Sequence, residues 1–156
     1  MHVRILFALS VASSALCAAQ LSVGSATTSP GETAIVEVRY TTEGAAATAL
    51  QFDLEYDQSK LTVTGAPGEA ATKAAKSLSV GDPSPSLKRF LIAGLNQTSF
   101  DDGVVVVLSV AVKRDAAPGS YDLKLTNLSA ADKRANRVAL SSGNGQVKVA
   151  RLASRR

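Results

Sequence analysis

The chain has 156 residues, which suits one domain better than two. Hydrophobic residues make up 46% and charged residues 19%, so the composition supports a packed core and excludes a disordered chain. The formal charge of +4 is spread along the sequence, and the densest basic cluster, at 133–137, contains no aromatic residue. We interpret that cluster as a solvated turn and expect no nucleic-acid partner.

The N-terminus has the features of a secretory signal peptide. A short basic start is followed by an almost wholly apolar run over 5–16 and by small residues up to Gln20. The run is shorter than the ~20 apolar residues of a membrane span, and no later segment is long and apolar enough to be one. We expect cleavage after Ala19 or after Ala18, and a secreted, periplasmic or cell-surface protein.

Cys17 leaves a second reading of this segment open. A lipoprotein would keep that cysteine as its lipidated first residue, but a small residue normally precedes such a cysteine, and Leu16 stands there. Cleavage after Ala19 leaves a chain without cysteine and, because His2 is also removed, without histidine. Such a chain has no Ser-His or Cys-His pair and no zinc or copper ligand set, so we expect no metal site and no cofactor.

Most of the remaining sequence alternates with a period of two, which is typical of β-strands. Turn residues rich in Gly, Pro and Asp separate the runs, and this spacing indicates a sandwich or barrel. We expect the domain over 20–150 and a frayed tail over 151–156. The strands are predicted over 33–40, 50–56, 61–64, 87–93, 104–112, 121–128 and 146–149.

Two segments depart from simple alternation. The run 104–112 is apolar or small at nearly every position, so we expect a central strand covered on both faces rather than a buried helix. The Ala-rich stretch 69–76 is either a short helix or a loop. Turns at 81–83 and 101–103 separate strands, and Asp101 and Asp102 belong to such a turn rather than to a calcium site.

The alternation also predicts the core. Its predicted members are Val36, Val38, Phe52, Leu54, Tyr56, Leu61, Val106, Leu108 and Val110. Tyr40 and Tyr121 also lie on predicted core faces, which leaves Phe90 and Phe100 as the rings that could be exposed. Two glycosylation sequons, starting at Asn96 and Asn127, are too short a pattern to carry a role.

Four features in order carry a family resemblance. They are Leu21-Ser22-Val23 followed by 29–33, the segment 50–63 with its Tyr56-Asp57 turn, Asp102-Gly103 before the long strand, and 118–123. This succession resembles the cohesin family over about 21–149. The resemblance implies an all-β jelly-roll sandwich of two antiparallel sheets with about nine strands. It also implies a protein without catalytic activity, in the structural class shared with several carbohydrate-binding modules.

Cohesins bind dockerins, small calcium-loaded helical modules on enzymes of polysaccharide-degrading assemblies, through one sheet face. The contacting positions often carry an amide and an acid, whereas the corresponding residues here are Ala49 and Gln51. This departure puts ordinary dockerin recognition in doubt. Because Phe52 and Leu54 point inward, Gln51 and Asp53 are predicted to point outward, and Lys124 and Thr126 do the same if Leu123 and Leu125 point inward. The resemblance places the two strands side by side in one sheet, which implies a partner-binding face that contains Ala49, Gln51, Asp53, Lys124 and Thr126.

Two other functions compete with protein docking. Asp53 and Glu55 lie about 6.5–7 Å apart along one strand, close to the spacing of glycosidase carboxylates. On an outward sheet face, however, neither acid would be desolvated, and Arg39 or Lys124 would pair with them, so we expect no enzyme. The alternative is a carbohydrate-binding module that contacts polysaccharide directly, although the chain has no Trp for a sugar-binding platform.

Overall fold

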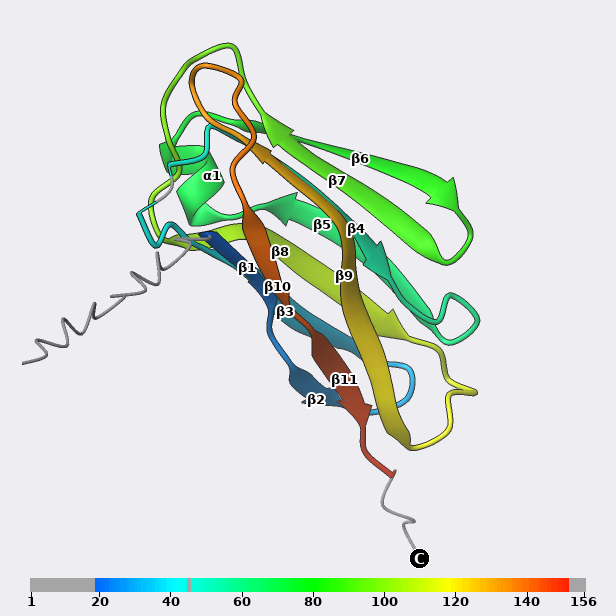
Figure 1. Cartoon of the computed structure of the whole chain (residues 1–156). Coiled ribbons are helices and arrows are strands. Elements are labelled where there is room, and N and C mark those ends of the chain that lie inside the picture. The colour runs from blue at the N-terminus through cyan, green and yellow to red at the C-terminus, as the bar shows by residue number, and fades with distance from the viewer. Residues whose placement is uncertain (1–18, 45, 152–156) are drawn as a thin grey trace, which may run out of the picture.

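The computed structural model describes residues 19–44 and 46–151. Two β-sheets lie face to face as a sandwich, with the hydrophobic core between them (Figure 1). The five-stranded sheet has the order β10-β1-β3-β8-β5, built from β1 (Ala19–Val23), β3 (Thr33–Thr41), β5 (Leu61–Pro67), β8 (Gly103–Val112) and β10 (Leu140–Gly143).

The six-stranded sheet has the order β2-β11-β9-β4-β7-β6. Its strands are β2 (Ala26–Thr28), β4 (Ala49–Glu55), β6 (Ser77–Ser84), β7 (Leu87–Ala93), β9 (Gly119–Ala131) and β11 (Gly145–Val149). One short helix, α1 (Glu69–Lys73), joins β5 to β6 and lies against β8. The all-β sandwich is confirmed, with 11 strands in the described residues rather than about nine.

The two sheets are mixed rather than purely antiparallel, which corrects one expectation. β1 pairs with β10 and β2 pairs with β11 in parallel, while the other ladders are antiparallel. The parallel pairs arise because the N-terminal segment and the C-terminal segment each contribute one strand to each sheet. The N-terminal segment passes from β1 to β2 at Gly24 and Ser25, and the C-terminal segment passes from β10 to β11 around Asn144. The two segments therefore run side by side in both sheets.

The predicted core is confirmed, with one residue at its margin. Eight of its nine members are at most 2% exposed, whereas Tyr56 is half-buried and packs against the core from outside. The buried aliphatic side chains of β3 and β8 belong to one core with Phe52 and Leu54 of β4, because all three strands direct alternate side chains toward the same interior. Because Phe52 and Leu54 point into the core, the residues that alternate with them on β4 point away from it.

The two rings that the sequence left as possible exposed rings, Phe90 and Phe100, are both buried. Phe90 stacks on Phe52 with ring centroids 5.1 Å apart, and Phe100 meets Tyr40 edge to face at 5.9 Å. Phe90 follows the alternation of β7, in which Ile92 is also buried. Phe100 lies in a loop, where no periodicity predicts burial.

Two strand predictions also need correction. β6 includes Gly81 and Pro83, which we expected to lie in a turn between strands, and its pairing with β7 is irregular between Gly81 and Ser84. β8 is central, but its outward side chains Val107 and Ser109 are only half-buried, so its second face is incompletely covered. The predicted signal peptide lies outside the described residues except for Ala19. No helix in the described residues is long and apolar enough to cross a membrane.

Candidate binding face

The outward surface of β4 and its neighbours β9 and β7 contains all five predicted site residues; we call it the β4 face. Asp53 lies opposite Thr126 of β9, and Glu55 lies opposite Lys124. Ala49 and Gln51 extend the row along β4. The five side chains do share one surface, but they differ in access: Lys124 is exposed, Asp53 is buried, and the other three are half-buried.

Asp53 is held by a bidentate ion pair with Arg89 of β7. Its Oδ1 accepts a hydrogen bond from Arg89 Nε at 2.8 Å, and its Oδ2 accepts one from Nη2 at 2.9 Å. We expected Arg39 or Lys124 as the partner, which is wrong. Arg39 lies on β3 in the other sheet and pairs with Glu37, whereas the strand order places β7 directly beside β4.

A β-bulge in β9 supplies the third member of this network. Between Gln51 and Asp53 the chain advances by two residues on β4 but by three on β9, from Ser129 to Thr126. Asn127 occupies the bulge with a φ of 51°, a conformation that asparagine tolerates better than most residues. Its Nδ2 donates to Asp53 Oδ2 at 3.3 Å.

The network leaves Asp53 ionised although the residue is only 3% exposed. The hydrogen bonds from Arg89 lower the pKa of Asp53, and those from Asn127 add to this effect against the opposing effect of burial. The expectation that this acid stays solvated is therefore wrong. The Asp53 carboxylate is occupied by hydrogen bonds from Arg89 and Asn127, so it is free neither to transfer a proton nor to attack a sugar, and Asp53 and Glu55 do not form a pair of glycosidase carboxylates.

One half of the β4 face carries no charge. There Leu91 of β7, opposite Gln51 and 39% exposed, lies among small or neutral side chains. The charged side chains lie further along the same strands, from Arg89 and Asp53 toward Glu55 and Lys124. An uncharged centre bordered by charged groups is the usual composition of a protein interface.

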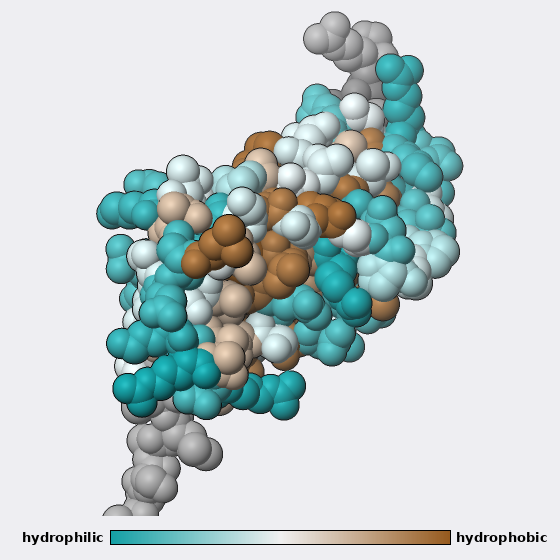
Figure 2. Space-filling view, turned by 90° about the horizontal axis from the view of Figure 1, so that it is seen from above, coloured by the Kyte–Doolittle hydropathy of each residue, from teal (hydrophilic) through white to brown (hydrophobic). Residues whose placement is uncertain are grey.

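The large exposed hydrophobic side chains are not all on the β4 face. Leu91 lies on it, whereas Val80 of β6 pairs with the buried Phe90 and so points to the core-facing side of the sheet, and Leu95 lies just after β7. Figure 2 looks at the molecule from above and shows hydrophobic residues in a band across the middle, with hydrophilic residues on either side. Ile35 is the fourth and lies on β3 of the five-stranded sheet.

The structure offers little to a conventional sugar platform or to a metal. Phe90 and Phe100, the two candidate rings, are buried in the core. Within 19–44 and 46–151, no group of three His, Cys, Asp or Glu side chains is placed to hold a metal ion. Asp102 instead accepts a hydrogen bond from the Thr42 N–H at 2.7 Å, which connects the segment before β8 to the residue after β3.

Sequence reasoning missed Arg89, Leu91 and Asn127. The alternation of 87–93 contains the signal for the first two, because Phe90 and Ile92 point inward and the residues between them must point out. The sequence gives no such signal for Asn127, because a bulge interrupts the alternation from which the direction of each side chain is inferred. The five predicted residues lie on the β4 face, and Arg89, Leu91 and Asn127 lie on it with them.

A β-sandwich with a flat, mixed-polarity sheet face belongs to the class of binding modules. The family model that matches is the cohesin domain, over residues 19–149, and the chain therefore belongs to the cohesin domain family. Cohesin domains are protein-binding modules without catalytic activity, so this chain is not an enzyme. Among proteins with curated descriptions, none matches the sequence.

Solved structures share the fold at low sequence identity. The sixth cohesin of scaffoldin B from Acetivibrio cellulolyticus, in complex with a mutant Cel5 dockerin, is 21% identical, with a TM-score of 0.75 over 85% of this chain and 99% of that one. The type I cohesin–dockerin complex Coh-OlpA-Doc918 from Clostridium thermocellum has 19% identity and a TM-score of 0.76 over 85% and 99%. A non-cellulosomal cohesin from Archaeoglobus fulgidus has 19% identity and a TM-score of 0.72 over 86% and 92%.

Proposed function

We propose that this domain docks a protein partner of the dockerin type on the β4 face. The observation that carries the proposal is the uncharged half of that face, with Leu91 and Gln51 at its centre and charged groups beside it. Several similar structures are complexes with dockerins, which supports a helical protein module as the partner. A flat face suits a protein better than a polysaccharide, which needs a concave or ring-lined site.

The proposed partner meets Arg89 rather than Asp53. Arg89 covers the buried carboxylate and keeps 41% of its own side chain exposed, so it presents a positioned guanidinium to a docked surface. The rigid pairing reduces the entropy lost when a partner binds. The resemblance aligns Ala49 and Gln51 with positions that often carry an amide and an acid in the family. The small Ala49 leaves room for a partner, and Gln51 presents a neutral amide.

We further propose that residues 1–18 are a signal peptide, that the domain acts outside the cytoplasm, and that Ala19 stays with the mature domain. Ala19 is fully buried, and its N–H donates to Ala139 O at 3.0 Å, so cleavage after it would remove a member of β1. Mass spectrometry of the exported protein tests this. A mature chain starting at Gln20 would contradict the argument, and a lipid adduct on Cys17 would establish the lipoprotein instead.

Calorimetric titration of the purified domain with dockerin modules from the same secretome tests the docking face. Leu91→Asp and Gln51→Arg should each weaken binding at least tenfold, about 1.4 kcal/mol. Ile35→Asp is the matched control, because it puts the same charge on an exposed aliphatic position of the opposite sheet. If Ile35→Asp abolishes binding while Leu91→Asp does not, the partner binds the five-stranded sheet and the β4 face is the wrong surface.

A further inference from the structure

The basic segment that we interpreted from the sequence as a solvated turn lines a cleft at the end of the sandwich. The turn joins β9 to β10, and the cleft has a volume of about 580 Å³. Its polar lining comes from Asp132, Lys133, Arg134, Asn136, Arg137 and, across the opening, Ser99. This volume lies within the ~300–1,000 Å³ range of small-ligand sites.

Hydrogen bonds at both ends hold the turn in shape. Asp132 Oδ1 accepts the backbone N–H groups of Arg134 and Asn136, each at 2.9 Å. The Asp132 N–H donates to Asn136 O at 2.9 Å, and the Ala135 N–H donates to Asp132 O at 3.0 Å. The basic side chains therefore extend from an ordered backbone, which lowers the entropy cost of binding a ligand through them.

The cleft has an excess of positive charge, because its lining contains three basic side chains and one acid. Lys133, Arg134 and Arg137 are all exposed, and no ion pair within the described ranges includes any of them. Asp132 is the one acid in the lining, and the backbone hydrogen bonds that it accepts lower its pKa and occupy its carboxylate. Arginine donors in such a position suit planar carboxylate groups.

We propose that this cleft binds an acidic oligosaccharide whose sugar rings carry carboxylates. Lys133, Arg134 and Arg137 pair with the carboxylates, while the Ser99 hydroxyl and the amide oxygen of Asn136, whose nitrogen faces Asp132, bind sugar hydroxyls. No aromatic side chain belongs to the cleft lining, so the site has no stacking surface for neutral sugar rings or nucleobases. Charge and hydrogen bonding are the recognition chemistry that the cleft offers.

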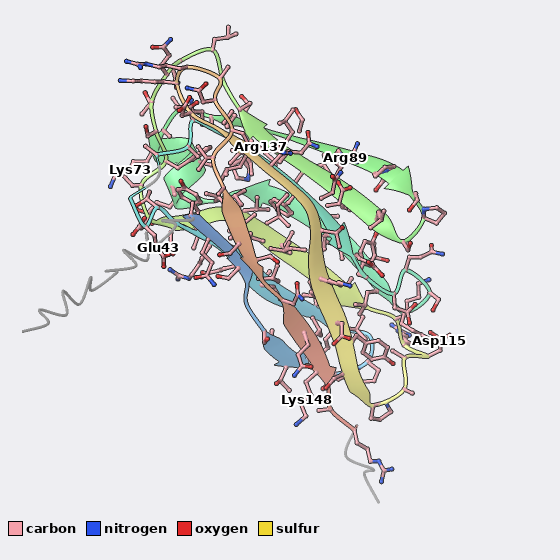
Figure 3. The ribbon with its side chains drawn as sticks, in the orientation of Figure 1. Glu43, Lys73, Arg89, Asp115, Arg137 and Lys148 are labelled. Carbon is pink, nitrogen blue, oxygen red and sulfur yellow. The ribbon has the colours of Figure 1, made fainter. Side chains whose placement is uncertain are left out.

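The site does not depend on the proposed docking function. The turn lies beyond the last residue of β9, past the uncharged half of the β4 face, and shares no residue with it. Figure 3 shows Arg137 near the upper end of the molecule and Lys148 at the opposite end. A domain could thus hold a protein on its sheet and an acidic glycan at its loops.

The test is titration of the purified domain with de-esterified oligogalacturonate at low ionic strength. Arg134→Gln combined with Arg137→Gln should weaken binding at least tenfold. The matched control, Arg114→Gln combined with Lys148→Gln, removes the same charge from exposed positions elsewhere and should change binding less than twofold. Leu91→Asp should also leave binding unchanged, which separates this site from the docking face.

Two further probes test the ligand class. Fully methyl-esterified oligogalacturonate should not bind measurably, because it lacks the carboxylates but keeps the hydroxyls. Polyglutamate of equal charge should bind at least tenfold more weakly, because it has carboxylates without hydroxyls. The proposal would be overturned if the ester or polyglutamate bound as tightly as the de-esterified oligogalacturonate. It would also be overturned if the cleft variant and the control variant lost the same amount of affinity.

Discussion

The ion pair between Asp53 and Arg89 should stabilise the fold measurably, unlike an ordinary surface pair. Asp53→Asn keeps the shape of the side chain and removes its charge. Hydrogen bonds to a charged group contribute about 1.5–3 kcal/mol, but water can replace part of this because the Arg89 side chain is 41% exposed. We therefore expect Asp53→Asn to lower the free energy of unfolding by about 1–2 kcal/mol at pH 7.

The pH dependence of this loss has a definite sign. The pKa of Asp53 in the folded state lies below its ordinary value of 3.8, so its stabilising effect is fully present above that value and is lost as the pH falls through the folded-state pKa. Urea titrations of the parent and of Asp53→Asn should thus differ by a constant amount between about pH 5 and pH 7, and by progressively less below about pH 4.

The pair of Glu37 and Arg39 on β3 is the control. Its nitrogen–oxygen distance is also 2.8 Å, but its side chains are 47% and 60% exposed. Glu37→Gln should therefore change the free energy of unfolding by less than about 0.5 kcal/mol. A cost for Asp53→Asn that is the same at pH 2 as at pH 7 would show that packing, not the charge, is responsible.

Three other substitutions test the packing by denaturant titration. Leu54→Ala removes a side chain with 0% exposure and should cost about 2–5 kcal/mol; a cost below 1 kcal/mol would mean that β4 faces the other way. Gly145→Ala would place a Cβ 2.0 Å from the carbonyl oxygen of Gly24, so we expect this variant to be less stable than the parent. A variant that unfolds at the same denaturant concentration as the parent would contradict this close approach of the two terminal segments. Asn96→Ala deprives the Lys76 ammonium, in a residue only 6% exposed, of its side-chain acceptor Oδ1 at 2.6 Å and leaves it the backbone carbonyl of residue 96 at 3.0 Å. We expect a cost of about 1–3 kcal/mol, against no change if the 94–98 loop is loosely held.

Alternation in the sequence is sufficient to predict most of the sandwich. In 50–56 it assigns Phe52 and Leu54 to the core and Gln51 and Asp53 to the opposite face, and the structure agrees about the faces, because a strand on a hydrophobic core has only two. It does not predict that Arg89 covers Asp53 and buries it. The same reasoning fails for Phe100, which is buried from a loop. It also misses much of β6, a serine-rich edge strand that pairs on one side only.

What a single sequence does not contain is the order of strands and their register. Arg39 and Arg89 are equally plausible partners for Asp53 until β7 is known to lie beside β4. The bulge at Asn127 is harder still to predict from the sequence, because one extra residue in β9 changes which side chain contacts the Asp53 carboxylate. Both facts belong to long-range pairing, which local periodicity does not encode.

The Asp53 network also bears on the kind of partner that the β4 face would accept. Ala49 and Gln51 are neutral, so neither supplies negative charge to the face. The remaining acid of that region, Asp53, is buried and saturated by Arg89 and Asn127. A partner docked over the centre of the face would therefore meet a guanidinium, an amide and Leu91. Such a partner should bring an apolar side chain and an acceptor or acid, rather than the cation that an exposed acid would select, and a dockerin whose contact surface is strongly basic should bind this domain poorly.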